Sequence, residues 1–191
     1  MSNEQNKEEA ETSMKTATDA DLLERSRSGD ASAFKQLVVR HEGRVAGVVQ
    51  SMLGRTAEAE DVGQEVFIRF YQSLDKFKGD AALSTYLIRI AINLSLNEIR
   101  RRKRKNAVFG SEEEGRFAAT SDDKSDTKEM VTYELKKLDP DFQSVVTLRL
   151  IEGYSTEETS EILGIPLGTV LSRLSRAQKK LKSVLSKYME A

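Results

Sequence analysis

The stretch from Phe77 to Lys105 constrains the fold more than any other part of the sequence. It opens with the turn signal Lys78-Gly79-Asp80, after which Ser84 offers a side-chain oxygen to cap a helix. Apolar residues then recur every three to four positions, so that one helix face can be buried, at Leu87, Ile88, Ala91, Leu94 and Ile99. The helix ends in six consecutive cations, residues 100–105. The pattern predicts a helix that packs on a core and grips phosphates at its far end; a solvated helix end that complements the helix dipole is the simpler interpretation.

Helical patterns also dominate the rest of the chain. No run of β-branched residues alternates with polar ones over a strand length, and the 191 residues include only 2 prolines. We therefore expect an all-α protein of two small helical domains joined by a flexible acidic linker. The segment between them is rich in Ser, Gly, Asp and Glu and has no sustained apolar period. The predicted boundaries are a disordered tail at 1–17, a first domain at 18–105, a linker at 106–128 and a second domain at 129–191.

A second helix of the first domain carries a polar face of its own. Thr56 is placed to cap it, and the buried stripe is expected to include Val62, Phe67 and Phe70. Four polar residues lie elsewhere on its surface, at Asp61, Gln64, Glu65 and Arg69. The simplest interpretation is an ordinary solvated face, and the functional one is a docking face for a basic partner surface.

The second domain has the pattern of a helix-turn-helix. Asp139-Pro140 starts one helix, and Ser155 with Glu158 has the spacing of a capping box that starts the next. The segment 164–166, Gly-Ile-Pro, makes a turn, and a strongly basic last helix follows from about Leu167. Two helices joined by a short glycine-containing turn, with a basic second helix, are typical of DNA-binding domains.

The charges are segregated along the chain, although the net charge is only -1. Residues 1–75 hold 9 basic and 14 acidic side chains, and residues 76–110 hold 9 and 2. Residues 111–166 hold 6 and 14, and residues 167–191 hold 6 and 1. Two basic blocks separated by acidic ones indicate two separate contacts with a polyanion and leave the acidic blocks for other partners.

The composition offers no catalytic or metal-binding set. There is no cysteine and one histidine, His41, without a second ligand spaced to join it. We therefore expect no enzyme activity, no metal, no cofactor and no small-molecule substrate. The polar, acidic N-terminus and the lack of an 18-residue apolar run predict a cytoplasmic protein without direct membrane insertion.

Three motifs, in order, resemble those of bacterial alternative sigma factors of the extracytoplasmic-function (ECF) group of the sigma-70 family. AEDVGQEVFIRFYQ is similar to the segment that binds core RNA polymerase. FKGDAALSTYLIRIAINLSLNEIRRRKR resembles the segment that melts and reads the minus-ten promoter element. LDPDFQSVVTLRLIEGYSTEETSEILGIPLGTVLSRLSRAQKKL resembles the domain that reads the minus-thirty-five element. The resemblance runs from about Ala20 to Tyr188, with only the linker unmatched.

The resemblance implies three partners: core RNA polymerase, promoter DNA and an anti-sigma factor. Polymerase would be bound by Asp61, Gln64, Glu65 and Arg69. The minus-ten element would be bound by Gly79, Asp80, Ser84, Tyr86, Asn93, Asn97, Arg100, Arg101, Arg102 and Arg104. In the last helix, base edges would be read by Ser172, Arg173 and Arg176, while Thr169 and Lys179 would fix the backbone register.

The sequence departs from the family pattern at two positions. Tyr86 stands where the family usually has tryptophan, and an aromatic face for packing or base stacking is kept. Leu171 stands where the family usually has lysine or arginine. The spacing of Leu167, Leu171 and Leu174 also suits a buried face, but a position that usually holds a cation must reach solvent, so we expect Leu171 to face the DNA.

Two rival classes stay open from the sequence. One is a two-domain helix-turn-helix regulator that binds DNA without polymerase. The other is a sigma mimic that occupies an anti-sigma factor and does not support transcription. The intact basic run and the basic last helix argue against the mimic.

Overall fold

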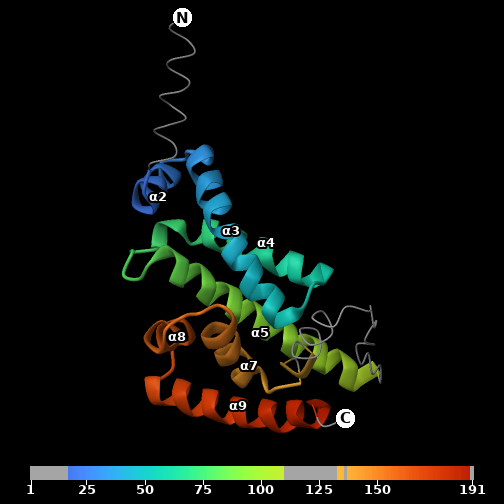
Figure 1. The fold of residues 1–191 in the computed structure, drawn as a ribbon. Coiled ribbons are helices and arrows are strands. Elements are labelled where there is room, and N and C mark those ends of the chain that lie inside the picture. Colours follow the sequence, from blue (N-terminus) through green and yellow to red (C-terminus); the bar gives the residue numbers. More distant parts are fainter. Residues whose placement is uncertain (1–16, 110–132, 136, 190–191) are drawn as a thin grey trace, which may run out of the picture.

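The computed structural model describes residues 17–109, 133–135 and 137–189, and every regular element in these ranges is helical (Figure 1). The all-α class is therefore confirmed. Almost all of the predicted N-terminal tail and residues 110–128 of the predicted linker lie outside the described residues. Within the described ranges, no helix has both the length and the apolar character needed to cross a membrane. The elements are α2 (Asp19–Arg27), α3 (Ala31–Leu53), α4 (Ala57–Gln72), η1 (Leu74–Lys76), α5 (Leu83–Phe109), α7 (Pro140–Val146), η2 (Thr147–Ile151), α8 (Thr156–Leu163) and α9 (Leu167–Met189).

Side-chain caps start most of these helices where the sequence places them. Thr56 Oγ1 accepts the amide of Ala59 at the start of α4, and Asp139 caps α7, whose first residue is proline. The capping box of Ser155 and Glu158 forms at α8. Each cap satisfies an amide that has no partner within its own helix. The predicted starts of these helices are confirmed for that reason.

Three details of the predicted helices are wrong. Helix α5 begins at Leu83, so Ser84 lies in its first turn and is not the cap residue. The same helix continues to Phe109, four residues into the segment assigned to the linker. The buried stripe of α4 centres on Ala59, Val66 and Phe70, while Phe67 is only half-buried. The apolar period does not fix the ends of a helix, and the packing of α4 on its neighbours decides which of its apolar residues are buried.

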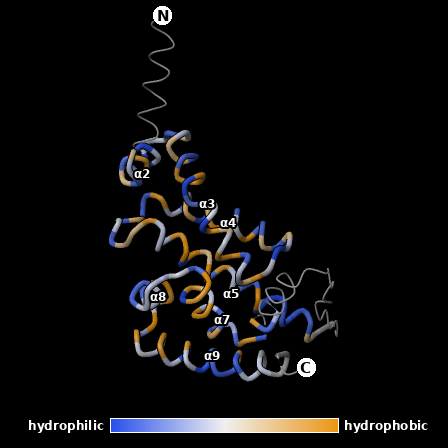
Figure 2. Tube along the Cα trace, in the orientation of Figure 1, coloured by the Kyte–Doolittle hydropathy of each residue, from blue (hydrophilic) through white to orange (hydrophobic). Residues whose placement is uncertain are grey.

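The first helical unit consists of α2, α3, α4, η1 and α5, with α5 packed against both α3 and α4. Its core is apolar, with fully buried side chains from each long helix, such as Leu37, Met52, Phe70, Leu87 and Ile92. In Figure 2 the trace of α5 is hydrophobic along its middle and hydrophilic towards its C-terminal end. The predicted combination of a packed helix and a polar end is therefore present.

The second unit is built from α7, η2, α8 and α9, and α9 packs along α7 and α8. A small core joins Leu135 and Leu138 to Val146 and Ala177. Segment η2 is a π-helix, so the helix predicted to run on from Pro140 changes its hydrogen-bonding pattern at Thr147. Gly153 follows η2 and Gly164 follows α8, with φ of 75° and 63°. Glycine adopts this backbone conformation without steric cost.

The two units pack against each other, with α5 between α3 and α4 on one side and α7 to α9 on the other (Figure 1). Leu148, Tyr154 and Ile162 of the second unit are buried in the same apolar cluster as the first unit's core. The buried Gln143 Nε2 donates to the Met52 carbonyl at 2.8 Å, and Ser51 Oγ donates to the Glu152 carboxylate at 3.1 Å. The helix-turn-helix unit thus rests on the C-terminal half of α3 and on α5.

Polar groups at this contact are incompletely paired. Arg89 Nη2 of α5 donates to the Glu161 carbonyl at the end of α8, but the buried Arg89 Nε has no hydrogen-bond partner among the described residues. The Tyr154 hydroxyl lacks one as well, and burial raises its pKa, while the Arg44 guanidinium 5.5 Å from the ring centre acts in the opposite direction. Unpaired buried polar groups cost free energy. These two groups therefore weaken the contact between the units, which the shared apolar cluster stabilises.

Candidate polymerase and nucleic-acid interfaces

The polar face of α4 is exposed as the sequence predicts. Asp61, Gln64 and Arg69 are exposed, and Glu65 is half-buried. Glu65 Oε1 accepts a hydrogen bond from Arg69 Nε at 2.8 Å, one helical turn away. Since these two charges offset each other, Asp61 and Gln64 are left as the groups most available to a partner. Among the described residues, α4 packs mainly on α3, α5 and η1, and the helices of the second unit pack elsewhere.

An apolar groove of about 590 Å³ lies beside this face, between α3 and α4. Small residues form part of its lining, including Ala46, Ala59 and Gly63. Ile68 also lines it and is 51% exposed. The sequence pattern did not predict this groove. Its signal in the sequence is small residues facing each other on two helices, which can be recognised only when the helix pairing is known.

The loop before α5 projects from the first unit. Lys78, Gly79, Asp80 and Ala82 are exposed, and Gly79 has φ of 80°, a backbone conformation that favours glycine. The predicted residues Gly79 and Asp80 are therefore accessible. Ser84, at the start of α5, is half-buried.

Tyr86 belongs to an aromatic cluster at the base of this loop. Its ring centre lies 4.9 Å from that of Phe77 and 6.2 Å from that of Phe70. The Tyr86 hydroxyl and Ser73 Oγ are 3.0 Å apart and share a hydrogen bond. Of the two roles expected for this ring, the structure shows packing, because its surroundings are protein side chains.

One face of α5 runs from the loop towards the basic end of the helix. Asn93 and Asn97 are both exposed on it, and Arg89 lies one turn before Asn93. Arg89 is the residue that contacts the end of α8. The second helical unit therefore approaches the same face on which the predicted base-reading residues lie.

The six cations at the end of α5 do not all point to solvent. Arg101 Nε and Arg102 Nε both donate to the Glu98 carboxylate, at 2.7 and 3.0 Å. The hydrogen bond from Arg101 lowers the pKa of Glu98 most, Arg102 adds to the decrease and burial opposes it. Arg102 also reaches Thr56 Oγ1 at 3.2 Å, so it ties α5 to the start of α4. Arg101 stays exposed despite its ion pair, and Arg100, Lys103, Arg104 and Lys105 are exposed as well.

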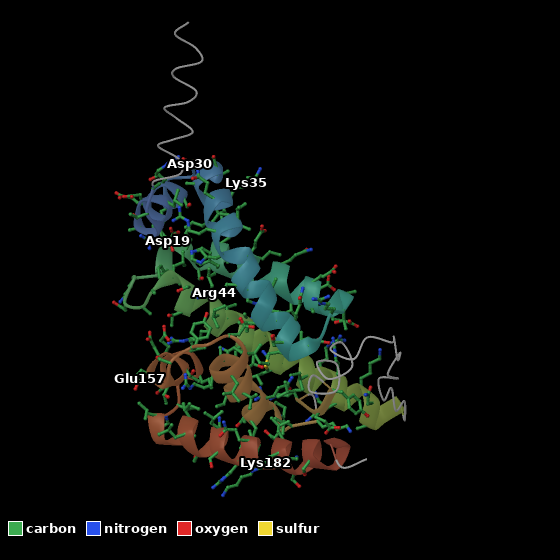
Figure 3. All side chains as sticks on the ribbon, in the orientation of Figure 1. Asp19, Asp30, Lys35, Arg44, Glu157 and Lys182 are labelled. Carbon is green, nitrogen blue, oxygen red and sulfur yellow. The ribbon has the colours of Figure 1, made fainter. Side chains whose placement is uncertain are left out.

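Helix α9 presents a basic face on the side of the molecule farthest from α3 and α4, where Figure 3 labels Lys182. Ser172, Arg176 and Lys179 are exposed, and Thr169 is half-buried. Arg173 is also half-buried and pairs with Asp141 of α7, Nη2 to Oδ2 at 2.6 Å. This predicted base-reading residue is therefore engaged within its own domain.

Leu171 is 50% exposed, so it does not belong to the core. The buried side of α9 is formed by Val170 and Ala177, with Leu174 and Leu181 packed at its edge. Leu167, which is 41% exposed, lies near Leu171 on the solvent side. The structure thus places Leu171 on the surface expected from the family's usual cation at this position.

Comparison with known proteins identifies both halves of the chain. Residues 37–105 match the family model for sigma-70 region 2, and residues 128–181 match that for sigma-70 region 4. The ECF RNA polymerase sigma-E factor of Haemophilus influenzae is 35% identical over 90% of this chain and 97% of its own length. The chain belongs to the ECF group of sigma factors. The first helical unit therefore contains region 2 and is called by that name below, and the second contains region 4.

A further relative and two solved structures are also similar to this chain. The sigma-E factor of Escherichia coli is 35% identical over 86% of this chain and 92% of its own length. The solved structure described as CnrH in complex with the cytosolic domain of CnrY has a TM-score of 0.65 and 28% identity, covering 87% of this chain and 96% of that one. The sigma factor RpoE of Bartonella quintana, solved with the anti-sigma factor NepR, has a TM-score of 0.62 and 25% identity, covering 80% and 96%.

Proposed function

We propose that this ECF sigma factor binds core RNA polymerase, recognises the minus-thirty-five and minus-ten promoter elements and promotes promoter melting to initiate transcription. The observation that carries the proposal is that regions 2 and 4 occur in order and expose the polar faces of α4, α5 and α9. Each of these faces has a chemistry that suits one of the partners.

Region 2 would bind polymerase through α4. Asp61 and Gln64 offer an acidic and an amide group, and the groove beside them offers an apolar surface. A basic helix of the partner with an apolar side chain would complement both features. This face stays exposed while region 4 packs on region 2, so polymerase binding does not require the two regions to separate first.

Region 2 would also capture an unpaired base of the minus-ten element at the loop before α5. Unstacking a base costs a few kcal/mol, which contacts in a pocket can offset. The exposed Asn93 can both donate to and accept from a base edge. Arg100, Lys103, Arg104 and Lys105 would hold phosphates, because their side chains are exposed at the end of the same helix.

Region 4 would read the minus-thirty-five element with α9. Arg176 is exposed and can pair with guanine in the major groove through two hydrogen bonds. Arg173 would have to leave Asp141 to take part. Lys179 and Thr169 would fix the backbone register.

An anti-sigma factor is the expected regulator. The structurally similar RpoE of Bartonella quintana was solved with the anti-sigma factor NepR. The proposal is that a protein of this class binds the chain and withholds it from polymerase. Its identity would be established by co-purification with the tagged chain, followed by inhibition of transcription with the purified partner.

Transcription in vitro tests the proposed function. Core polymerase with the chain is expected to initiate at a discrete set of promoters in a genomic library, whereas core polymerase alone does not. The chain alone should bind those promoters far more weakly than the holoenzyme. Tight promoter binding without polymerase would support a conventional helix-turn-helix regulator, and no initiation from any promoter would support a sigma mimic.

A further inference from the structure

Arg27, the last residue of α2, makes two hydrogen bonds that reach the base of the loop before α5. Its Nε donates to the Leu74 carbonyl at 3.2 Å, and its Nη2 donates to the Phe77 carbonyl. These acceptors lie 47 and 50 residues further along the chain. Leu74 is the first residue of the 3₁₀ turn η1, and Phe77 directly follows this turn. Carbonyl groups at such positions lack partners within a helix. One guanidinium therefore fixes the backbone that leads into the loop.

Helix α2, which carries this guanidinium, is held in place by core packing and by an ion pair. Leu22 and Leu23 are buried in the region 2 core. Arg25 forms an ion pair with Asp30 at 2.7 Å, which ties α2 to the start of α3. Arg27 itself has no carboxylate partner within the described residues, so its charge acts on the two carbonyl groups. Hydrogen bonds from a charged donor are stronger than those between neutral groups.

The loop itself has no comparable support. No hydrogen bond joins residues 78–81 to another part of the described chain. Among the described residues, the chain before the loop is held by Arg27 and by the buried Phe77 ring. The chain after it is held by the buried Leu83 and by the hydrogen bond between Tyr86 and Ser73. This arrangement leaves the tip accessible while its ends are held.

We propose that Arg27 is a positioning residue for the capture of the minus-ten base. By holding the carbonyls of Leu74 and Phe77, it sets the direction in which Gly79 and Asp80 leave the core before DNA arrives. A site held in its bound geometry loses less entropy on binding and discriminates better between ligands. The inference rests on the proposed function, because it assigns a role within the same base-capturing site.

The planar fork of arginine is essential to this role. A lysine keeps the positive charge but cannot direct two fixed N–H groups to two carbonyl oxygens. Arg27→Lys therefore separates positioning from simple attraction of DNA phosphates. Arg25→Lys is the matched control, because Arg25 lies on the same helix and contacts Asp30 instead of the loop.

The test uses holoenzyme reconstituted from core polymerase and the full chain. Forked templates are made from a promoter on which the wild-type chain initiates, with each base varied in turn in the single-stranded minus-ten segment. Arg27→Lys and Arg27→Ala are expected to lower discrimination at the captured base about tenfold. The affinity of both variants for core polymerase should stay within about twofold of wild type. The salt dependence of template binding by the Arg27→Lys holoenzyme should match that of wild type, because the charge is kept. Arg25→Lys should match wild type in every measurement.

Amide hydrogen exchange supplies a readout that needs no DNA. The amides of Lys76 and Phe77 donate to the Ser73 carbonyl at 2.9 and 3.1 Å, and the Arg27 variants should exchange them faster while the amides of α3 and α4 stay protected. Unchanged amide exchange and unchanged base discrimination in Arg27→Lys would overturn the inference. Loss of discrimination in Arg27→Ala but not in Arg27→Lys, with a reduced salt dependence of binding, would also overturn it, because it would show that only the charge matters. If the wild-type holoenzyme shows no base preference in the single-stranded segment, the proposed minus-ten function itself fails.

Discussion

Replacing Gln143 by alanine is expected to weaken the packing of region 4 on region 2. Gln143 is 2% exposed, and its side-chain amide donates to the Met52 carbonyl at 2.8 Å. Met52 lies in the last turn of α3, where no amide of the same helix donates to the carbonyl oxygen. The substitution therefore removes the partner supplied by the other region and leaves a buried acceptor unpaired.

The size of the effect follows from this loss. An unpaired buried acceptor costs about 1–3 kcal/mol. If the cost falls on the packed state alone, the ratio of separated to packed molecules rises roughly 5- to 150-fold. The existing unpaired groups, Arg89 Nε and the Tyr154 hydroxyl, already weaken the same contact. The change is therefore expected to be large enough to detect as a shift in population.

Fluorescence energy transfer measures that population directly. The chain has no cysteine, so dyes can be placed at Gln72→Cys on α4 and Lys180→Cys on α9, both exposed positions. Gln143→Ala should lower the transfer efficiency at equal helix content by circular dichroism. Gln178→Ala is the matched control, because Gln178 is exposed on α9, which packs along α7 and α8.

Equal transfer efficiency in the Gln143→Ala and Gln178→Ala proteins would refute the reasoning. It would show that the apolar contact and the remaining hydrogen bonds, from Ser51 to Glu152 and from Arg89 to Glu161, hold the two regions together without Gln143. A loss of helix content in Gln143→Ala would instead show that the glutamine stabilises region 4 itself, and the predicted separation would then be wrong.

Further predictions concern the polymerase face, the recognition helix and pH. Replacing Asp61 and Gln64 together by alanine should weaken core polymerase binding in a titration with unchanged helicity, and unchanged affinity would contradict the docking face. Leu171→Arg should leave the melting temperature within a few degrees of wild type, because the position is exposed. It should also steepen the salt dependence of promoter binding by about one unit. A lowered melting temperature without a steeper salt dependence would contradict this prediction. Because the hydrogen bond from Arg101 lowers the pKa of Glu98, Glu98 stabilises the fold above the pKa of its unfolded state and loses that effect as pH falls through the folded pKa. Glu98→Gln should therefore reduce the acid-induced drop in melting temperature below about pH 4, and an unchanged drop would argue against the ion pair.

Local signals in the sequence determine most of the helices. Thr56, Asp139 and the pair Ser155 and Glu158 cap helices where the sequence predicts them, because a cap involves residues only two or three positions apart. The motifs that identify regions 2 and 4 are also local, so the order of the two units could be predicted. The exposed faces of α4 and α9 follow from the same helical period.

Several helix boundaries and buried stripes needed the tertiary structure. Val66, and not Phe67, lies at the centre of the buried stripe of α4. Both side chains are apolar, so the helices that pack on α4 decide which of the two is buried. The change from α-helix to π-helix at Thr147 likewise has no signal in the apolar period.

Only the tertiary structure decided which predicted DNA-binding residues are engaged within the protein. Arg102 reaches Thr56, and Arg173 pairs with Asp141, although the sequence shows both only as members of a basic face. Arg27 contacts Leu74 and Phe77 across 47 and 50 residues, and Gln143 contacts Met52 across 91. A charged side chain binds whichever acceptor the fold brings near it. That acceptor is set by how the helices pack, and a short window of sequence holds no information on it.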